Sequence, residues 1–79
     1  MTEFNLEGDT HIPLHNLLKI KGLCQSGASA KHVIASGQVL VDGQVELRKR
    51  CKIVAGQVVE FMGHSVKVIN TKSNPGLQE

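Results

Sequence analysis

The spacing of leucines near the start of the chain predicts a first helix. Leu14, Leu17 and Leu18 stand at positions i, i+3 and i+4, a spacing that places apolar side chains on one face of an α-helix. Pro13 suits the first turn, where the missing amide hydrogen of proline costs nothing. Gly22 is a natural end, because glycine readily adopts the left-handed conformation that closes many helices. We therefore expect a short helix between these two residues.

A second helix is predicted a few residues later. Ser26 is a favourable N-cap, since its hydroxyl can accept a hydrogen bond from an amide of the first turn. Ala30, Val33 and Ile34 form an apolar face, and Gly37 marks the end of the helix. Neither helix is long enough to be stable alone, so both must pack on other elements.

Beyond the second helix the apolar spacing becomes alternating, which predicts strands. Asp42-Gly43 is a strong signal for a type I′ hairpin turn. Ala55-Gly56, which follows Ile53-Val54, and Gly63-His64 mark two further turns. The predicted strands are residues 38–41, 44–47, 58–61 and 66–69, with residues 3–6 as a short opening strand.

These elements predict an α+β fold, with two short helices packed on a small, mostly antiparallel sheet of about four or five strands. A chain of 79 residues forms one domain, which we place at residues 1–69. The polar composition of residues 70–79, with Pro75-Gly76, predicts a disordered tail. Phe4 and Phe61 are the only aromatic residues, which argues against proteins that stack bases on aromatic side chains.

The formal net charge is only +2, but its distribution is uneven. Residues 1–12 hold three acids and no base, a net −3, whereas residues 13–67 hold eight lysines and arginines against three acids, a net +5. Four of these bases fall in the run Arg48-Lys49-Arg50-Cys51-Lys52. Neighbouring cations repel one another, so such a cluster is easier to explain if a polyanion meets it. The pattern favours nucleic-acid binding over the alternative of a merely soluble basic face.

Metal binding is not predicted. Cys24 and Cys51 lie 27 positions apart with no CxxC pair, and a structural zinc site needs four ligands at characteristic spacings. His11 and His15 stand four residues apart, but the metalloprotease motif also needs a glutamate between them, and Pro13 argues against one helix carrying both. The cysteines are expected to be reduced and partly buried, as in a cytosolic protein.

Catalysis and membrane insertion are not predicted either. The only acids in the basic part of the chain are Asp42, Glu46 and Glu60, which do not assemble into a nucleophile with its base and orienting group. No cofactor motif is present. The first residues do not resemble a signal peptide, and no apolar run approaches the roughly 20 residues that a membrane span needs. We expect a non-enzymatic, soluble, cytoplasmic protein.

The order of these residues resembles the RNA-binding domain named after ribosomal protein S-four, also called the αL motif. The resemblance covers about residues 12–61. Short length and an acidic opening strand are most similar to the small stand-alone bacterial members of that family. The matching positions are Leu14, Leu17, Leu18, Gly22, Leu23, Ser26, Ala30, Ile34, Gly37, Val39, Val41, Asp42, Gly43, Ile53, Gly56 and Val59.

The resemblance implies binding to structured RNA, mostly ribosomal or transfer RNA, through a basic surface of the two helices and the loop after the hairpin. By position, Ser26 and Lys31 would face phosphate. Gly27 departs from the family, which commonly has Arg there, so a bidentate phosphate contact is missing. Gln57 replaces the usual Asp, which concerns turn chemistry. The loop residues expected to contact RNA are Arg48, Lys49, Arg50 and Lys52.

Four of the candidate RNA contacts have two interpretations each. Lys19 and Lys21 either contact RNA or interact with the negative end of the first helix dipole. Ser26 is an N-cap first, but the amides at that helix start could also hold a phosphate. His32 is either an RNA contact or an ordinary surface residue.

Two functions therefore compete. The leading one is a protein that docks on structured RNA, whether ribosomal, transfer or precursor RNA, through phosphate contacts on a basic surface. The alternative is a protein-interaction or assembly module acting at the ribosome. Its partner could contact the acidic residues Glu3, Glu7 and Asp9, which could equally keep the opening strand from pairing with other chains.

Overall fold

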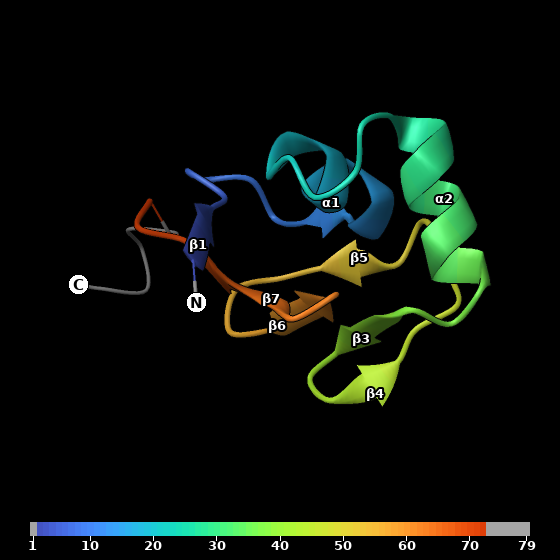
Figure 1. The fold of residues 1–79 in the computed structure, drawn as a ribbon. Coiled ribbons are helices and arrows are strands. Elements are labelled where there is room, and N and C mark those ends of the chain that lie inside the picture. The colour runs from blue at the N-terminus through green and yellow to red at the C-terminus, as the bar shows by residue number, and fades with distance from the viewer. Residues whose placement is uncertain (1, 73–79) are drawn as a thin grey trace.

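The computed structural model describes residues 2–72, so residues 73–79 of the predicted tail lie outside the described residues. Two helices and seven strands make up this part of the chain (Figure 1). In chain order they are β1 (Thr2–Asn5), β2 (Ile12–Pro13), α1 (Leu14–Ile20), α2 (Gly27–Ala35), β3 (Val39–Val41), β4 (Gln44–Val45), β5 (Lys52–Ile53), β6 (Val58–Phe61) and β7 (His64–Ile69).

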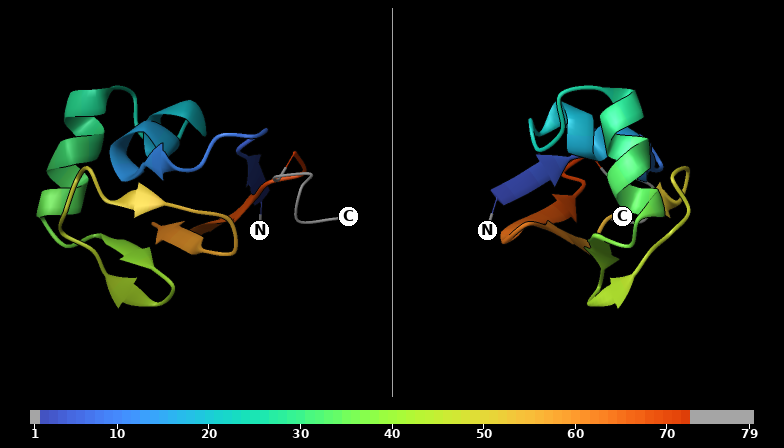
Figure 2. Two further views of the ribbon diagram at one scale, coloured as in Figure 1. Left: turned by 180° about the vertical axis from the view of Figure 1, so that it is seen from behind. Right: turned by 45° about the vertical axis from the view of Figure 1, so that its right-hand side comes forward.

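The strands form two sheets. Five of them make one sheet in the order β1-β7-β6-β3-β4, and β2 pairs with β5 in a second, two-stranded sheet. Neighbours in the larger sheet are antiparallel except β1 and β7, which pair in parallel. Both helices lie on one side of the larger sheet, with β1 at one end of the molecule and α2 at the other (Figures 1 and 2). The predicted α+β fold with a mostly antiparallel sheet is confirmed.

The core lies between the helices and one face of the larger sheet. Alternation along β6 buries Val59 and Phe61, while Val58 and Glu60 are only half-buried, as expected for a sheet that is covered on one side. The three leucines that predicted α1 have no exposed surface. The buried residues are Leu6, Ile12, Leu14, Leu17, Leu18, Cys24, Ala30, Ile34, Val39, Val41, Ile53, Val59, Phe61, Val66 and Val68.

Both helices end as the glycines predicted. Gly22 follows α1 with φ 75°, and Gly37 follows α2 with φ 82°; at each end two backbone hydrogen bonds close the helix in a Schellman arrangement. At the start of α2, the Ser26 hydroxyl oxygen accepts a hydrogen bond from the Ser29 amide at 3.1 Å. The predicted N-cap is therefore present.

Several boundaries differ from the prediction. The strand predicted at residues 44–47 ends at Val45, and the opening strand and the strands predicted at 38–41 and 66–69 are shifted by one or two residues. Pro13 ends β2 and is the N-cap of α1 rather than a residue of its first turn. The third turn is formed by Met62 (φ 50°) and Gly63 (φ 80°), and His64 already belongs to β7. A type I′ turn needs positive φ at both central residues, as also found at Asp42 (φ 53°) and Gly43 (φ 83°). In both turns the glycine fills the second central position. The third turn therefore lies at Met62-Gly63, one residue earlier than the predicted Gly63-His64.

Asn70 ties the end of β7 to the loop after β1. Its side-chain oxygen accepts a hydrogen bond from the Gly8 amide at 2.9 Å, and its side-chain nitrogen donates to the Asp9 carbonyl at 3.0 Å. Asn5 and Thr71 are joined by a side-chain hydrogen bond of 2.8 Å. The first residues of the predicted tail are thus held against the fold by contacts with the opening strand and loop.

Candidate nucleic-acid interface

The basic run folds into a tight turn that presents Lys49 and Arg50. The Cys51 amide donates to the Arg48 carbonyl at 3.1 Å, which closes a four-residue turn with Lys49 and Arg50 at its two central positions. Both residues are exposed. Within residues 2–72, neither side chain forms an ion pair with an acid. Two uncompensated cations therefore stand side by side at the tip of this turn.

The start of α1 holds the turn in place. The Leu14 amide donates to the Cys51 carbonyl at 2.9 Å, and the His15 amide donates to the Lys49 carbonyl at 3.1 Å. Because the first amides of a helix have no partner within the helix, the turn supplies the acceptors that α1 lacks. Nδ1 of the His15 ring lies 2.9 Å from the same Lys49 oxygen and can donate to it when Nδ1 carries the proton.

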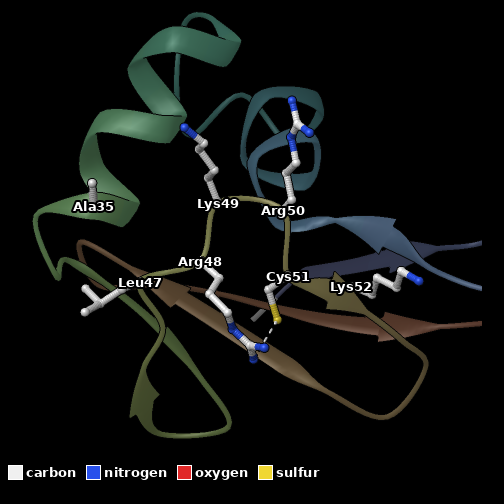
Figure 3. A pocket seen from close by; sticks show the side chains of 7 residues that line it. All are labelled: Ala35, Leu47, Arg48, Lys49, Arg50, Cys51 and Lys52. Atoms are coloured by element: carbon white, nitrogen blue, oxygen red, sulfur yellow. Dashed lines mark hydrogen bonds between the residues drawn. The ribbon is translucent and has the colours of Figure 1, made fainter.

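The turn and the end of α2 border an open groove of about 750 Å³. In Figure 3, the Lys49 side chain extends toward α2 and that of Arg50 toward α1, whereas Arg48 turns the opposite way and lies beside Cys51. We call this hollow the basic groove. Its lining residues are Ala35, Leu47, Arg48, Lys49, Arg50, Cys51 and Lys52.

One face of α2 leads from the start of that helix to the basic groove. Gly27, Lys31 and Ala35 are spaced four residues apart, so they lie one above the other on the same side of the helix. Ala35 lines the groove, which places Lys31 one turn and Gly27 two turns further along. The half-buried Lys31 therefore extends the positive surface away from the groove along α2.

Arg48 carries a charge that is already paired. Its Nε lies 2.8 Å from Oε2 of Glu46 and its Nη2 lies 3.3 Å from Oε1, while its backbone amide donates to Oε2 at 3.0 Å. Nη2 also lies 3.9 Å from Sγ of Cys51. The hydrogen bond from the Arg48 side chain, helped by that from its amide, lowers the pKa of Glu46 to about 2. Glu46 thus fixes the orientation of the guanidinium and offsets its charge.

We expect Glu46 to titrate with a pKa of about 2 in the folded protein, against an ordinary value of 4.5. Because folding lowers this pKa, the stabilising contribution of the pair is complete above about pH 4.5 and is lost as the pH falls toward 2. Carbon-13 NMR of the side-chain carboxyl measures the titration. Arg48→Ala should raise the pKa toward 4.5, and the matched change Arg50→Ala should leave it in place. An equal pKa in wild type and Arg48→Ala would contradict the pairing.

Lys19 and Lys21 lie apart from each other. Lys19 is exposed and stands one helical turn after His15, on the side of α1 that contacts the turn. Lys21 points the other way, since its Nζ donates to the backbone carbonyl of Glu3 in β1 at 3.0 Å. The structure therefore does not bring Lys21 to the basic groove.

Three other candidates differ in their relation to the groove. Lys52 begins β5 and lines the groove. His32 is exposed on α2 and is not among the lining residues. Ser26 lies at the far end of α2, where its hydroxyl oxygen already accepts the capping hydrogen bond. These placements favour Lys52 as a groove residue and leave Ser26 and His32 outside it.

Sequence reasoning missed several residues of this site. A signal for Glu46 was available, because residues two apart on an extended chain point to the same side, and Glu46 and Arg48 are so spaced. Leu47 lines the groove with 60 % of its surface exposed, and no pattern marks an exposed leucine in advance. His15 contacts a carbonyl 34 positions away, which only the folded chain reveals.

Features of other site classes are absent from the part of the chain that the structure describes. Across residues 2–72, no three His, Cys, Asp or Glu side chains gather closely enough to hold a metal ion. No helix in the same range has the length and apolar character needed to cross a membrane. Cys24 is buried, Cys51 is half-buried and both are free; burial is the main cause that raises the pKa of each thiol.

Comparison with known families gives a match over nearly the whole described chain. The model of the S4 domain matches residues 4–69. The chain belongs to the S4 domain family. The resemblance drawn from residues 12–61 is thereby confirmed, and the match extends into β1 and through β7, which pair with each other.

Two bacterial proteins and one solved structure are similar to this S4 domain over most of its length. It is 59% identical over 69 residues to YbcJ of Escherichia coli (strain K12) and to YbcJ of Shigella flexneri, a span of 87% of this chain and 99% of each relative. The solution structure of the E. coli protein matches with a TM-score of 0.69 over 87% of each chain. That structure is described as revealing an αL (ALFAL) motif involved in RNA binding. The expected similarity to small bacterial members of the family is confirmed.

Proposed function

We propose that this S4 domain binds structured RNA through the basic groove and the adjoining face of α2. The observation that carries the proposal is the pair of cations Lys49 and Arg50, which have no acidic partner within residues 2–72 and are held by backbone hydrogen bonds at the tip of a fixed turn. A polyanion compensates both charges at once, and a preformed turn loses little conformational entropy when it binds. The αL motif of the E. coli relative, described as involved in RNA binding, supports the same role.

The arrangement suits phosphate contacts better than base readout by hydrogen bonds. Lys49, Arg50 and Lys52 line the groove, and Lys31 continues the positive surface along α2. Such contacts set the position of a protein on its nucleic acid and carry little sequence information. We therefore propose recognition of folded RNA, such as ribosomal, transfer or precursor RNA, mainly by its backbone and shape, with no catalytic step.

Fluorescence anisotropy at two salt concentrations tests this function. The ligands are a structured ribosomal RNA fragment and an unstructured strand of equal length. With roughly three to five phosphates neutralised, log affinity should fall with log salt at a slope of about −2 to −4, and the folded RNA should bind more tightly. Affinity that does not change with salt would contradict the proposal. Failure to bind either RNA would contradict it too and would favour the alternative of a protein partner.

Gly27→Arg is expected to increase RNA affinity several-fold. Gly27 is in the first turn of α2, on the face that leads to the basic groove, and a Cβ added there meets no atom within 4 Å apart from its chain neighbours and the backbone of its own helix. An arginine at this position adds a phosphate contact, which should steepen the salt slope by about 0.7 to 0.9. The measurement is the same anisotropy titration.

Gly27→Ala is the matched control for that gain. It supplies the helix propensity of a non-glycine residue without the charge, so RNA affinity and salt slope should stay at the wild-type values. An equal gain in both variants would assign the effect to helix stability and not to a phosphate contact.

A further inference from the structure

We propose that the basic groove holds an unpaired nucleotide of the bound RNA, with its base stacked on the Arg48 guanidinium and its phosphates on Lys49 and Arg50. The inference rests on the proposed function and specifies the kind of RNA that this site recognises. It gives the residues of the basic run two different roles, base stacking for Arg48 and phosphate binding for Lys49 and Arg50. Their different surroundings in the groove are the reason.

Arg48 differs from its neighbours in charge and in orientation. Glu46 occupies Nε and Nη2 of the guanidinium, and Sγ of Cys51 lies 3.9 Å from Nη2. With its charge offset at one edge, Arg48 is a weaker phosphate ligand than Lys49 or Arg50. Its side chain is nevertheless 78% exposed, so a flat surface held in a fixed plane remains accessible. Guanidinium planes are surfaces on which unpaired RNA bases commonly stack.

The groove also has an apolar part that phosphate binding does not require. Leu47 and Ala35 both line it and are exposed to solvent, and Cys51 contributes a half-buried sulfur. Apolar neighbours do not stabilise a bound phosphate, whereas a base buries apolar surface when it contacts them. A volume of about 750 Å³ falls within the roughly 300–1,000 Å³ that is usual for small-molecule sites. A single nucleotide is a ligand of that size.

The composition of the chain adds a second argument. Phe61 is buried and Phe4 is packed half-buried against the core, so neither of the two aromatic side chains of this protein can receive a base at the groove. Two exposed guanidinium planes line the groove, those of Arg48 and Arg50, and Glu46 holds that of Arg48 in one orientation. In Figure 3, Lys49 and Arg50 extend toward the helices while Arg48 turns away from them. Phosphates on the helix side and a base on the Arg48 side would thus occupy different parts of the groove.

The expected consequence is a preference for RNA in which one nucleotide is displaced from the helix. A continuous duplex keeps every base stacked and offers phosphates alone, whereas a bulge offers a base that is free to leave the helix. The preference should be about tenfold, at the lower end of what stacking of one base on a protein side chain provides.

Two RNA hairpins of equal nucleotide number test this inference. In one, 2-aminopurine is a single-nucleotide bulge; in the other it is paired within the stem. Wild-type protein should bind the bulged hairpin about tenfold more tightly and change the 2-aminopurine fluorescence in that hairpin alone. Arg48→Lys retains the charge but removes the plane, so the preference should fall to near unity, whereas binding of both hairpins should still weaken with salt. Arg50→Lys is the matched control and should keep the preference.

The outcomes separate this inference from the function on which it rests. Salt-dependent binding of both hairpins with equal affinity would overturn the nucleotide site and leave the RNA-binding function intact. Retention of the preference in Arg48→Lys would overturn the role given to Arg48 and with it the inference. Absence of binding to both hairpins would overturn the inference together with the proposed function.

Discussion

Replacing both Lys49 and Arg50 with alanine is expected to lower the affinity for structured RNA by roughly ten- to a hundredfold at moderate salt. These residues supply the two uncompensated charges at the tip of the turn, and each phosphate contact that is lost reduces counterion release. The salt slope should become shallower by about 1.5 to 2, since each contact contributes roughly 0.7 to 0.9. Anisotropy titrations at several salt concentrations give both quantities.

Lys67→Ala with Lys72→Ala is the matched control for that double variant. Both lysines are exposed and lie outside the lining of the basic groove, so this variant removes the same net charge from another part of the surface. Its affinity should stay within about twofold of wild type, because neither lysine lines the groove and salt screens the field of solvent-exposed charges. Equal losses in the two double variants would show that overall charge and not the groove determines binding.

Leu17→Ala is expected to destabilise the domain by about 2 to 5 kcal/mol, the usual cost of removing a large buried side chain and leaving a cavity. Leu17 has no exposed surface and lies on the face of α1 that packs into the core. In a domain of this size such a loss lowers the melting temperature by at least about 10 °C. Thermal unfolding followed by circular dichroism measures it.

The same helix provides the control. Ile20 has 59% of its surface exposed, so Ile20→Ala should change stability by less than about 0.5 kcal/mol. Both changes remove a branched aliphatic side chain from α1, and they differ mainly in burial. If Ile20→Ala were as destabilising as Leu17→Ala, the packing of α1 described above would be wrong.

Local sequence signals were reliable where a single physical rule decides the structure. Leucine spacing predicted α1, Ser26 predicted the start of α2, and Gly37 and Asp42-Gly43 predicted the helix end and hairpin that follow. In each case the controlling interaction spans a few residues: a helical face, a cap, or a positive φ that glycine tolerates. Boundaries moved by one or two residues where two neighbouring residues could fill the same role, as at Met62-Gly63.

Such local rules do not predict which distant segments pair with each other. Parallel pairing of β1 with β7 joins residues more than 60 positions apart, and the alternation within each strand is the same whether its partner runs parallel or antiparallel. The small sheet of β2 and β5 likewise depends on where the chain returns after α2. Strand pattern indicates which face is buried and leaves the choice of partner to tertiary packing.

For the candidate site, the sequence by itself determined the charge, the family and the run of bases at residues 48–52. The tertiary structure decided which of the candidate bases are free to meet RNA. Arg48 is paired with Glu46, Lys21 is turned toward β1, and Lys49 and Arg50 are held at the tip of a turn by the amides of α1. Charge is a property of residue type and can be read from the sequence. Whether a charge is compensated depends on distances of a few ångströms between side chains. Those distances are set only when the helices and the sheet pack together.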